Sequence, residues 1–207
     1  MGRAIYVSSV NGDDANSGYA PEKAFRSLRK VNQMEIQPGD QILLERGSVF
    51  AGEYLHLYKG GTKEAPVVVD AYGEGALPRI EADGNGIWYQ NYGGHLDNVV
   101  HTWKGYLSSA VLLYDAEYIT VRNLEITNDP LVKNERMNQA DRMNRTGVSV
   151  IAQNHGTLHQ IELAYLYVHD VEGNIYDKHL NNGGIYMSVS RPDDEEKTGI
   201  ARYDGIH

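Results

Sequence analysis

Two aspartates occupy corresponding places in the sequence and could do acid–base chemistry together. Asp129 comes three residues after Ile126, and Asp170 comes two residues after Val168, each at the end of a short apolar stretch. Cleavage of a glycosidic bond commonly uses two carboxyl groups, about 5–5.5 Å apart in retaining enzymes and farther apart where a water attacks. Because the two offsets differ by one residue, strict register would place Asn128 beside Asp170. The unequal offsets therefore weaken Asp129 and Asp170 as a catalytic pair.

Other titratable side chains crowd residues 168–182. The predicted catalytic residues are Asp170, Asp129, His169 and Asp177, and the predicted substrate contacts in this stretch include His179. Histidine and carboxylate side chains are the usual general acids and bases of enzymes. The competing interpretation is that these aspartates end strands through Asx turns, which occur in many proteins without any catalytic role.

Aromatic residues are concentrated in residues 85–108, which hold both tryptophans of the chain. Rings with polar tips suit stacking on the apolar faces of sugars, and binding residues are often carried on loops. The predicted substrate contacts here are Trp88, Tyr89, Tyr92 and Trp103. The alternative is that the rings merely cover an end or a flank of the fold.

A basic segment could serve a different reaction. Four basic residues between positions 133 and 145 stand against two acidic ones, which gives a local charge of 4 − 2 = +2: Lys133, Arg136, Arg142 and Arg145 against Glu135 and Asp141. A lyase that acts on a uronic-acid polymer needs a base and positive groups that stabilise the developing charge. Arg142 is therefore a further predicted substrate contact, although a solvated loop of mixed charge is the commoner explanation of such a segment.

Metal-binding patterns are weak. His155 and His159 have the spacing of a helical ligand pair, but Gly156 and the adjoining strand-like sequence argue against a helix. The acidic stretches 11–16 and 193–196 offer oxygen ligands of the kind calcium takes, without the downstream bidentate glutamate of a helix-loop-helix calcium site. We predict no metal site and no cofactor, with calcium as the cation these stretches could accept.

Composition limits the classes of partner. The chain has 207 residues, a net charge of −9 and no cysteine, so it can have neither disulfides nor a cysteine nucleophile. The negative charge disfavours nucleic acid and acidic membranes, and no apolar run approaches the roughly 20 residues of a membrane span. We expect an oligo- or polysaccharide as partner. A native start at Met1 would imply the cytoplasm, and a removed leader would imply secretion or the periplasm.

Short apolar runs, closed by Gly, Asn or Asp, predict many short strands. Phe25, Leu28 and Val31 follow a helical spacing between two prolines and predict one short helix over residues 25–33. Residues 131–145 have sparse apolar positions, which indicates an inserted loop.

An internal repeat organises these strands. The pattern Ile119-x-Val121-x-x-Leu124-x-Ile126 recurs with every apolar position shifted by 161 − 119 = 42 residues. Residues 110–112 recur at 147–149 and at 184–186, and residue 206 begins another copy of the strand at 161. Such units bury their apolar faces by stacking, with each strand parallel to its copy at roughly 4.8 Å. An antiparallel sandwich is the main alternative, but it does not explain why the units repeat in order.

Several stretches resemble the amino-terminal cap and first coils of bacterial right-handed parallel β-helix carbohydrate-active enzymes, the pectate-lyase-like superfold. The resemblance covers nearly the whole chain and rests on residues 6–8, 11–18, 21–28, 37–44, 65–73 and 117–128. It implies an all-β solenoid with a short amino-terminal capping helix, and carbohydrate chemistry by glycoside hydrolases or polysaccharide lyases. It does not choose the reaction.

The expected organisation is one β-helix domain over residues 1–207. Residues 1–40 would form the cap and first coil, and residues 85–108 and 130–146 would be inserted loops. We expect this to be the amino-terminal part of a longer β-helix, whose open end further coils or a second chain would cover and whose catalytic residues could lie elsewhere. A glycoside hydrolase is preferred to a polysaccharide lyase because the chain is acidic; a noncatalytic carbohydrate-binding solenoid is the third hypothesis.

Overall fold

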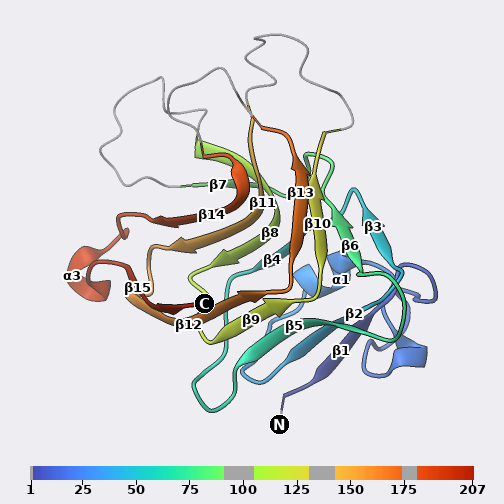
Figure 1. Cartoon of the computed structure of the whole chain (residues 1–207). Helices are drawn as coiled ribbons and strands as arrows, with labels where there is room; N and C mark the ends of the chain where they lie inside the picture. The colour runs from blue at the N-terminus through green and yellow to red at the C-terminus, as the bar shows by residue number, and fades with distance from the viewer. Residues whose placement is uncertain (1, 91–104, 131–142, 174–180) are drawn as a thin grey trace.

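The computed structural model describes residues 2–90, 105–130, 143–173 and 181–207, and these are nearly all β-structure (Figure 1). The strands are β1 Ala4–Val7, β2 Gln41–Glu45, β3 Val49–Ala51, β4 Leu55–Leu57, β5 Val67–Tyr72, β6 Arg79–Glu81, β7 Ile87–Tyr89, β8 Tyr106–Tyr114, β9 Ile119–Arg122, β10 Glu125–Asn128, β11 Asn144–Ala152, β12 Thr157–Ala164, β13 Tyr167–Val171, β14 Gly183–Val189 and β15 Arg202–Ile206. The all-β prediction is confirmed.

Helices are few and short: a 3-10 turn η1 over Pro21–Lys23, α1 over Leu28–Asn32 and α3 over Glu195–Thr198. The helix predicted over residues 25–33 is therefore too long at its start. Phe25 is instead extended, because its N–H donates to the carbonyl of Tyr6 and it forms a parallel bridge with Val7. No helix in the described part of the chain is long and apolar enough to cross a membrane.

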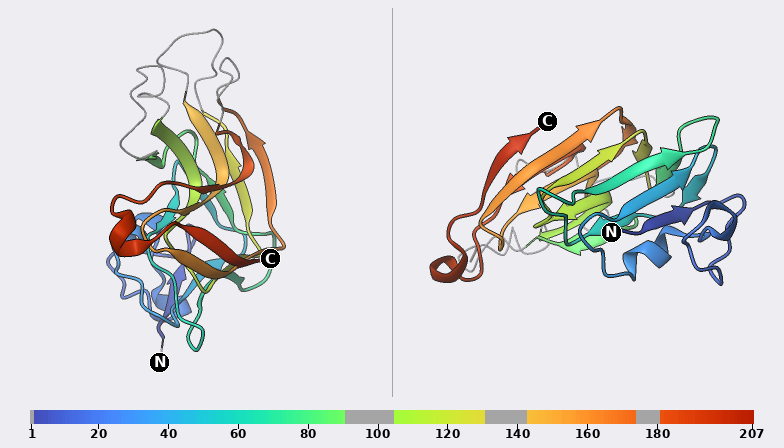
Figure 2. Two further views of the ribbon diagram at one scale, coloured as in Figure 1. Left: turned by 90° about the vertical axis from the view of Figure 1, so that its left-hand side faces the viewer. Right: turned by 90° about the horizontal axis from the view of Figure 1, so that it is seen from below.

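The strands form three sheets that the chain visits in rotation. Sheet A has the order β1-β2-β5-β9-β12-β15, sheet B the order β13-β10-β6-β3, and sheet C the order β14-β11-β8-β4. From β8 onward the chain passes C, A, B and again C, A, B, so each pass adds one strand to each sheet. Seen from below in Figure 2, the strands of sheet A run side by side in the order of their colours.

Residues in equivalent positions stack across successive passes. In sheet A, Ile5 pairs with Ile42, Ile42 with Val69, and Val69 with Val121. These four side chains have no exposed surface and belong to the main core enclosed by the sheets. Every added rung thus buries apolar area against the rung before it, which is the main favourable contribution to folding.

The predicted repeat register is confirmed. Ile119 pairs in parallel with Ile161, which in turn pairs with Ile206. Val111 pairs with Val148, and Val148 with Ile185. Among the named strand pairs of the described residues, the pairing of β7 with β8 is antiparallel and all others are parallel, so the sandwich alternative fails.

The bends between sheets A and B use left-handed backbone. Asn123, between β9 and β10, has φ 57°, and Tyr165, between β12 and β13, has φ 52°. Asparagine adopts this conformation readily, whereas an aromatic side chain does so at a cost that the surrounding structure must offset. These single residues turn the chain within two positions and so keep the strands of sheet B next to those of sheet A.

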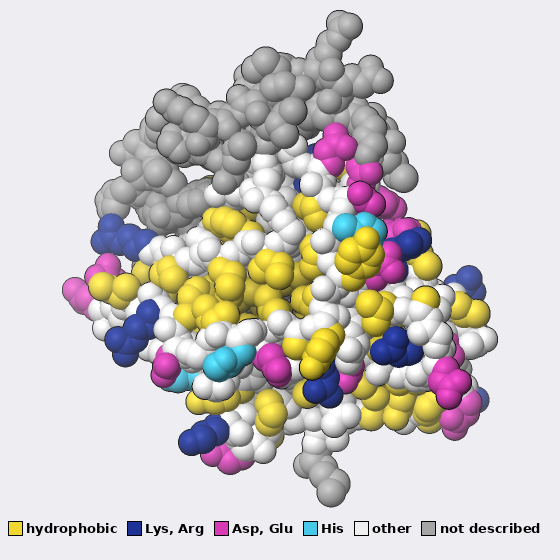
Figure 3. Space-filling view, viewed as in Figure 1, with side chains coloured by type: hydrophobic (Ala, Val, Ile, Leu, Met, Phe, Trp, Pro, Cys, Tyr) yellow, Lys and Arg dark blue, Asp and Glu magenta, His cyan; other side chains and the backbone are white. Residues whose placement is uncertain are grey.

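The face toward the viewer in Figure 1 is formed by β12, β13, β14 and β15, and apolar side chains gather at its centre in Figure 3. β13, β14 and β15 each stand at the edge of their sheet. Several inner side chains of this pass are only partly buried: Leu163, Leu166, Val168, Met187 and Tyr203. The prediction that further coils or a second chain cover this face remains a prediction.

Candidate functional site

Polar side chains meet where the strands of sheet B end and those of sheet C begin. Asn128, the last residue of β10, is fully buried, and its amide oxygen accepts from the N–H of Gly84 at 2.9 Å. Its amide nitrogen donates to the carbonyls of Ser108 at 3.1 Å and Thr146 at 2.9 Å. Asn128 therefore joins three successive passes of the chain and fixes the geometry of this corner.

The outer face of sheet C carries a second, smaller apolar cluster. Trp88 of β7 lies against this face with only 7% of its surface exposed, packed with Leu107, Leu112 and Ile151. Its indole N–H donates to the hydroxyl of Ser109 at 2.8 Å. The predicted substrate contact Trp88 thus occupies the packed position that the alternative interpretation expects.

Three buried hydroxyl groups form a closed network beside Trp88. The side-chain oxygen of Ser109 lies 2.7 Å from that of Thr146 and 2.9 Å from that of Ser149, and Thr146 and Ser149 lie 2.8 Å apart. Each hydroxyl can donate once and accept twice, so the three satisfy one another and also accept the indole N–H. The network holds β7, β8 and β11 in a fixed relation.

A buried histidine of the neighbouring strand β4 lies beside this network. His56 of β4 is 7% exposed, and its Nε2 lies 2.9 Å from the carbonyl oxygen of Ser109. Burial lowers the pKa of His56 to about 4, despite this hydrogen bond. His56 is therefore neutral at pH 7 and, because a carbonyl only accepts, carries its proton on Nε2.

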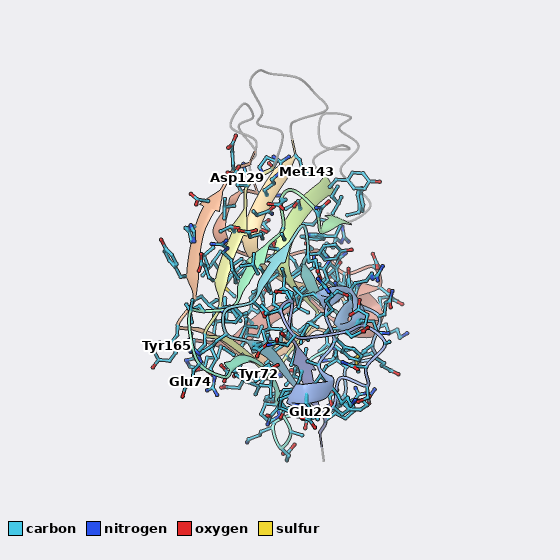
Figure 4. The ribbon with its side chains drawn as sticks, turned by 90° about the vertical axis from the view of Figure 1, so that its right-hand side faces the viewer. Glu22, Tyr72, Glu74, Asp129, Met143 and Tyr165 are labelled. Atoms are coloured by element: carbon cyan, nitrogen blue, oxygen red, sulfur yellow. The ribbon has the colours of Figure 1, made fainter. Side chains whose placement is uncertain are left out.

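Asp129 follows Asn128 and is partly exposed, at the same end of the sheets as Met143 (Figure 4). The neighbouring Arg145 is 9% exposed; its N–H donates to the Asn182 side chain at 2.8 Å and its guanidinium to the carbonyl of Glu172 at 3.2 Å. The corner thus holds a carboxylate, a guanidinium and several amides on adjacent passes. Groups of these types can orient a polar ligand and transfer protons to it.

The expected pairing of Asn128 with Asp170 is wrong. Asn128 pairs with Val171, because β13 has a bulge that sets His169 and Asp170 opposite a single residue of β10. Asp170 lies in this bulge with φ 46°. With the extra residue counted, Asp129 comes level with Glu172, so the two aspartates do not occupy equivalent positions.

His169 and Asp170 form a charged row on the outside of sheet B. The Nδ1 of His169 lies 2.9 Å from Asp170 and its Nε2 lies 3.1 Å from Glu125, which Arg79 also contacts at 3.3 Å. Burial alone would lower the pKa of His169, but the hydrogen bonds to Glu125 and Asp170 outweigh it and raise this pKa. The Tyr167 ring stacks on His169 at 4.1 Å. The imidazolium form is thereby favoured.

Of the other predicted contacts, Tyr89 is half exposed and forms an edge-on pair with Tyr106 at 5.0 Å. The remaining five predicted site residues lie outside the described residues: Tyr92, Trp103, Arg142, Asp177 and His179.

The two histidines of the weak metal pattern bind one carboxylate instead. His155 Nε2 lies 3.0 Å from Glu117 Oε1, and His159 Nδ1 lies 2.7 Å from Glu117 Oε2. His159 borders a cavity of about 710 Å³ that is lined by residues of β9 and β12. Glu117, just before β9, borders a separate cavity of about 460 Å³. Within the described ranges no group of three or more His, Cys, Asp or Glu residues is arranged to hold a metal ion.

Sequence reasoning missed the buried polar residues of the corner. Asn128 was considered only for its register, and Gln90, Asn144 and Thr146 were not singled out. The repeat carried the signal: position 146 is aligned with Ser109 by the 37-residue offset, so polar residues recur at equivalent positions of β8 and β11. Buried polar residues that recur in this way indicate a hydrogen-bonded row.

No protein-family model matches the sequence. A lacto-N-biosidase of Bifidobacterium longum subsp. longum is 41% identical over 92% of this chain and 13% of its own length. The crystal structure of a GH136 lacto-N-biosidase from Eubacterium ramulus, as its selenomethionine derivative, is 57% identical over 100% of this chain, with a TM-score of 0.90. The native form of that protein matches with a TM-score of 0.89. The chain spans about a third of the solved relatives, 33% of each.

These comparisons correct the resemblance drawn from the sequence. The pectate-lyase-like superfold was the wrong group, because the relatives over the full chain are GH136 lacto-N-biosidases. A rhamnogalacturonan lyase matches at 12% identity with a TM-score of 0.47, too distant to carry an argument. The relatives are glycoside hydrolases, the class that the sequence analysis preferred to polysaccharide lyases.

Proposed function

We propose that this chain belongs to a glycoside hydrolase that acts on lacto-N-biosides. The observation that carries the proposal is the 57% identity to a GH136 lacto-N-biosidase over the whole chain, at a TM-score of 0.90. Activity is proposed for the protein as a whole, because this chain spans 33% of the solved relatives and 13% of the Bifidobacterium relative. An uncharged oligosaccharide also suits a chain of net charge −9.

We further infer that the three sheets form one right-handed parallel β-helix over residues 1–207. Support comes from the rotation of the chain through sheets A, B and C and from the parallel pairing of equivalent residues. Crossovers between parallel strands of one sheet are right-handed in nearly all proteins. Residues 1–40 would cap the first coil. Residues 85–108 and 130–146, which include β7 and the first residues of β8 and β11, would hold insertions beside sheet C.

The reacting groups that we propose within this chain are the carboxylates at the corner of sheets B and C. Asp129 is the stronger candidate because it follows directly on the rigid, fully bonded Asn128. Asp170 and His169 are further candidates from β13, and Asp177 from outside the described residues. One carboxyl group would protonate the leaving oxygen and the other would act as nucleophile or activate water. Tyr89 supplies an exposed ring for a sugar face.

The test measures hydrolysis of a chromogenic lacto-N-bioside by the protein as its gene encodes it. Asp129→Asn and Asp170→Asn should each lower kcat by about 10²–10⁴-fold if the group transfers a proton in the reaction. Glu22→Gln is the control, because Glu22 is exposed on η1 at the opposite end from Asp129 (Figure 4). Full kcat in both aspartate variants would reject the site assignment, and absence of hydrolysis by the unaltered protein would reject the proposed function.

A further inference from the structure

The outer face of sheet A carries an extra side chain in each of two successive passes. Because residues of a strand alternate between its faces, one residue is expected between two that point inward. In β12 two residues, His159 and Gln160, stand between the buried Leu158 and Ile161, and Gln160 has φ 50°. Tyr118 has φ 47° at the equivalent place of the previous pass, just before β9. Left-handed backbone at these two positions therefore turns additional side chains away from the core.

These side chains border a cavity of about 710 Å³, a volume typical of small-molecule sites. Side chains from three passes of sheet A line it: Tyr118, Thr120, His159, Gln160, Glu162 and Asp204. Sheet A runs along the bottom of Figure 1, whereas Asp129 is labelled near the top of Figure 4. The cavity thus lies apart from the corner of sheets B and C.

Two rings at the cavity are held in a fixed orientation. The Tyr118 ring stacks on that of His159, with centroids 5.7 Å apart and planes at 13°. The carboxylate of Glu117 accepts from the His159 backbone N–H at 3.1 Å and from its Nδ1 at 2.7 Å. Because a carboxylate only accepts, Nδ1 carries a proton and Nε2 is the ring nitrogen directed toward Asp204.

A gap separates His159 from Asp204 at the cavity. The Nε2 of His159 lies 3.9 Å from Oδ2 of Asp204, which is too long for a direct hydrogen bond. One hydroxyl group placed between them can reach both atoms. Asp204 is 74% exposed, so a ligand can approach it from solvent.

The remaining polar groups favour a ligand rich in hydroxyl groups and without negative charge. Glu162 accepts from the Thr120 hydroxyl at 2.9 Å, and its carboxylate and that of Asp204 repel phosphates and carboxylates. Lys63, which also lines the cavity, offsets one of these two charges. Gln160 adds an amide that both donates and accepts. Hydroxyl groups on a partly apolar ring, which can lie against an aromatic side chain, are characteristic of sugars.

We propose that this cavity is a second glycan-binding site, in which an uncharged sugar residue lies against Tyr118 and His159 and hydrogen-bonds to Asp204 and Gln160. The choice of a glycan rests on the proposed function, whereas the cavity is separate from the carboxylates proposed to react. A glycan held here keeps its other residues at a high effective concentration near the protein.

The decisive variant is Tyr118→Asn, with Tyr165→Asn as the matched control. Both tyrosines have left-handed backbone, with φ 47° and 52°, and asparagine adopts this conformation readily. Tyr165, labelled in Figure 4, is 81% exposed and does not line the cavity. Asp204→Ala is a second test variant, because a side chain that is 74% exposed can be removed with little effect on folding.

Binding is measured at the site itself by nuclear magnetic resonance of the protein as its gene encodes it, labelled in its histidine side chains. The His159 signal is identified by its absence in His159→Gln. Lacto-N-biose, lactose, maltose and cellobiose are the neutral probes, and galacturonic acid is the anionic one. At least one neutral sugar should shift the His159 signal in a saturable way, and galacturonic acid should not.

The Kd from this titration should rise about tenfold in Tyr118→Asn and in Asp204→Ala, which is about 1.4 kcal/mol, and should be unchanged in Tyr165→Asn. Equal Kd values in Tyr165→Asn and in both test variants would overturn the inference. So would a His159 signal that no neutral sugar shifts, or that galacturonic acid shifts as strongly. Failure of the proposed function is distinguishable, because it shows as absence of hydrolysis by the unaltered protein while a neutral sugar still shifts His159.

Discussion

At the scale of single residues, the buried polar side chains of this protein differ in how completely they are hydrogen-bonded. His56 is held neutral because burial disfavours its charged form, and its single donated hydrogen bond goes to a carbonyl. Asn128 satisfies an amide completely, while its neighbour Asn144 satisfies none of it with described residues. Position within the three sheets, rather than residue type, decides which of these groups is hydrogen-bonded.

His56 predicts a specific dependence of stability on pH. Its pKa is about 4 in the folded chain, against 6.5 in the unfolded chain, so the unfolded state binds more protons between these values. The stabilisation is fully present above about pH 6.5 and is lost as pH falls toward 4, by about 3 kcal/mol. Chemical denaturation at pH 7 and pH 4 measures this loss.

The comparison variant is His56→Gln, which can still donate to the Ser109 carbonyl but does not titrate. Its loss of unfolding free energy between pH 7 and pH 4 should be smaller by about 3 kcal/mol, since the carboxylates contribute equally to both proteins. Equal losses in the two proteins would mean that His56 is solvated or charged in the folded state.

At the scale of elements, the fold depends on close approach between sheets B and C. A β-carbon at Gly147 of β11 would lie 2.4 Å from the Val168 side chain and 2.7 Å from the Gly184 carbonyl oxygen. At Gly184 of β14, one pass later, the nearest atom would be 3.4 Å away. Glycine is thus required at the first position and optional at the second, although both follow the same repeat.

Gly147→Ala should therefore lower the free energy of unfolding by about 1–3 kcal/mol, because the new methyl group meets backbone that cannot yield. Gly184→Ala should change it by less than about 1 kcal/mol, since the contact is an ordinary one. Urea denaturation of both variants makes the comparison. A Gly147→Ala protein as stable as Gly184→Ala would contradict the tight packing of β11 on β13.

At the scale of the whole molecule, charge distinguishes neutral from anionic glycans. A net charge of −9 repels a polyuronate at long range, and this repulsion is screened by salt. A lacto-N-bioside is uncharged, so its binding should not depend strongly on ionic strength. The acidic chain and the relatives thus favour the same class of substrate.

Affinity electrophoresis at low and high salt tests this expectation. The protein should be retained by an immobilised neutral glycan that displays lacto-N-biose at both salt concentrations, and should migrate freely through polygalacturonate at both. Retention by polygalacturonate that weakens as salt rises would instead indicate a basic binding surface, as the lyase hypothesis requires.

The sequence by itself determined the repeat and therefore the pairing. Ile161 pairs with Ile119 and with Ile206, as their spacing in the repeat predicts. The register is fixed because a shift by one residue would turn the apolar side chains of a strand out of the core. Local turn residues such as Asn123 also follow from the sequence. The acidic charge also favoured a glycoside hydrolase over a polysaccharide lyase, and the relatives belong to that class.

Only the tertiary structure decided which polar residues come together. The bulge at Asp170 shifts the register by one residue, and such insertions do not change the apolar pattern that a sequence displays. Trp88 became a packing residue because β7 folds back antiparallel on β8, a pairing that depends on contacts 21 residues apart. Asn128 of sheet B and Asn144 of sheet C are the same residue type, and their hydrogen bonding differs because it depends on the neighbours that the fold brings to each.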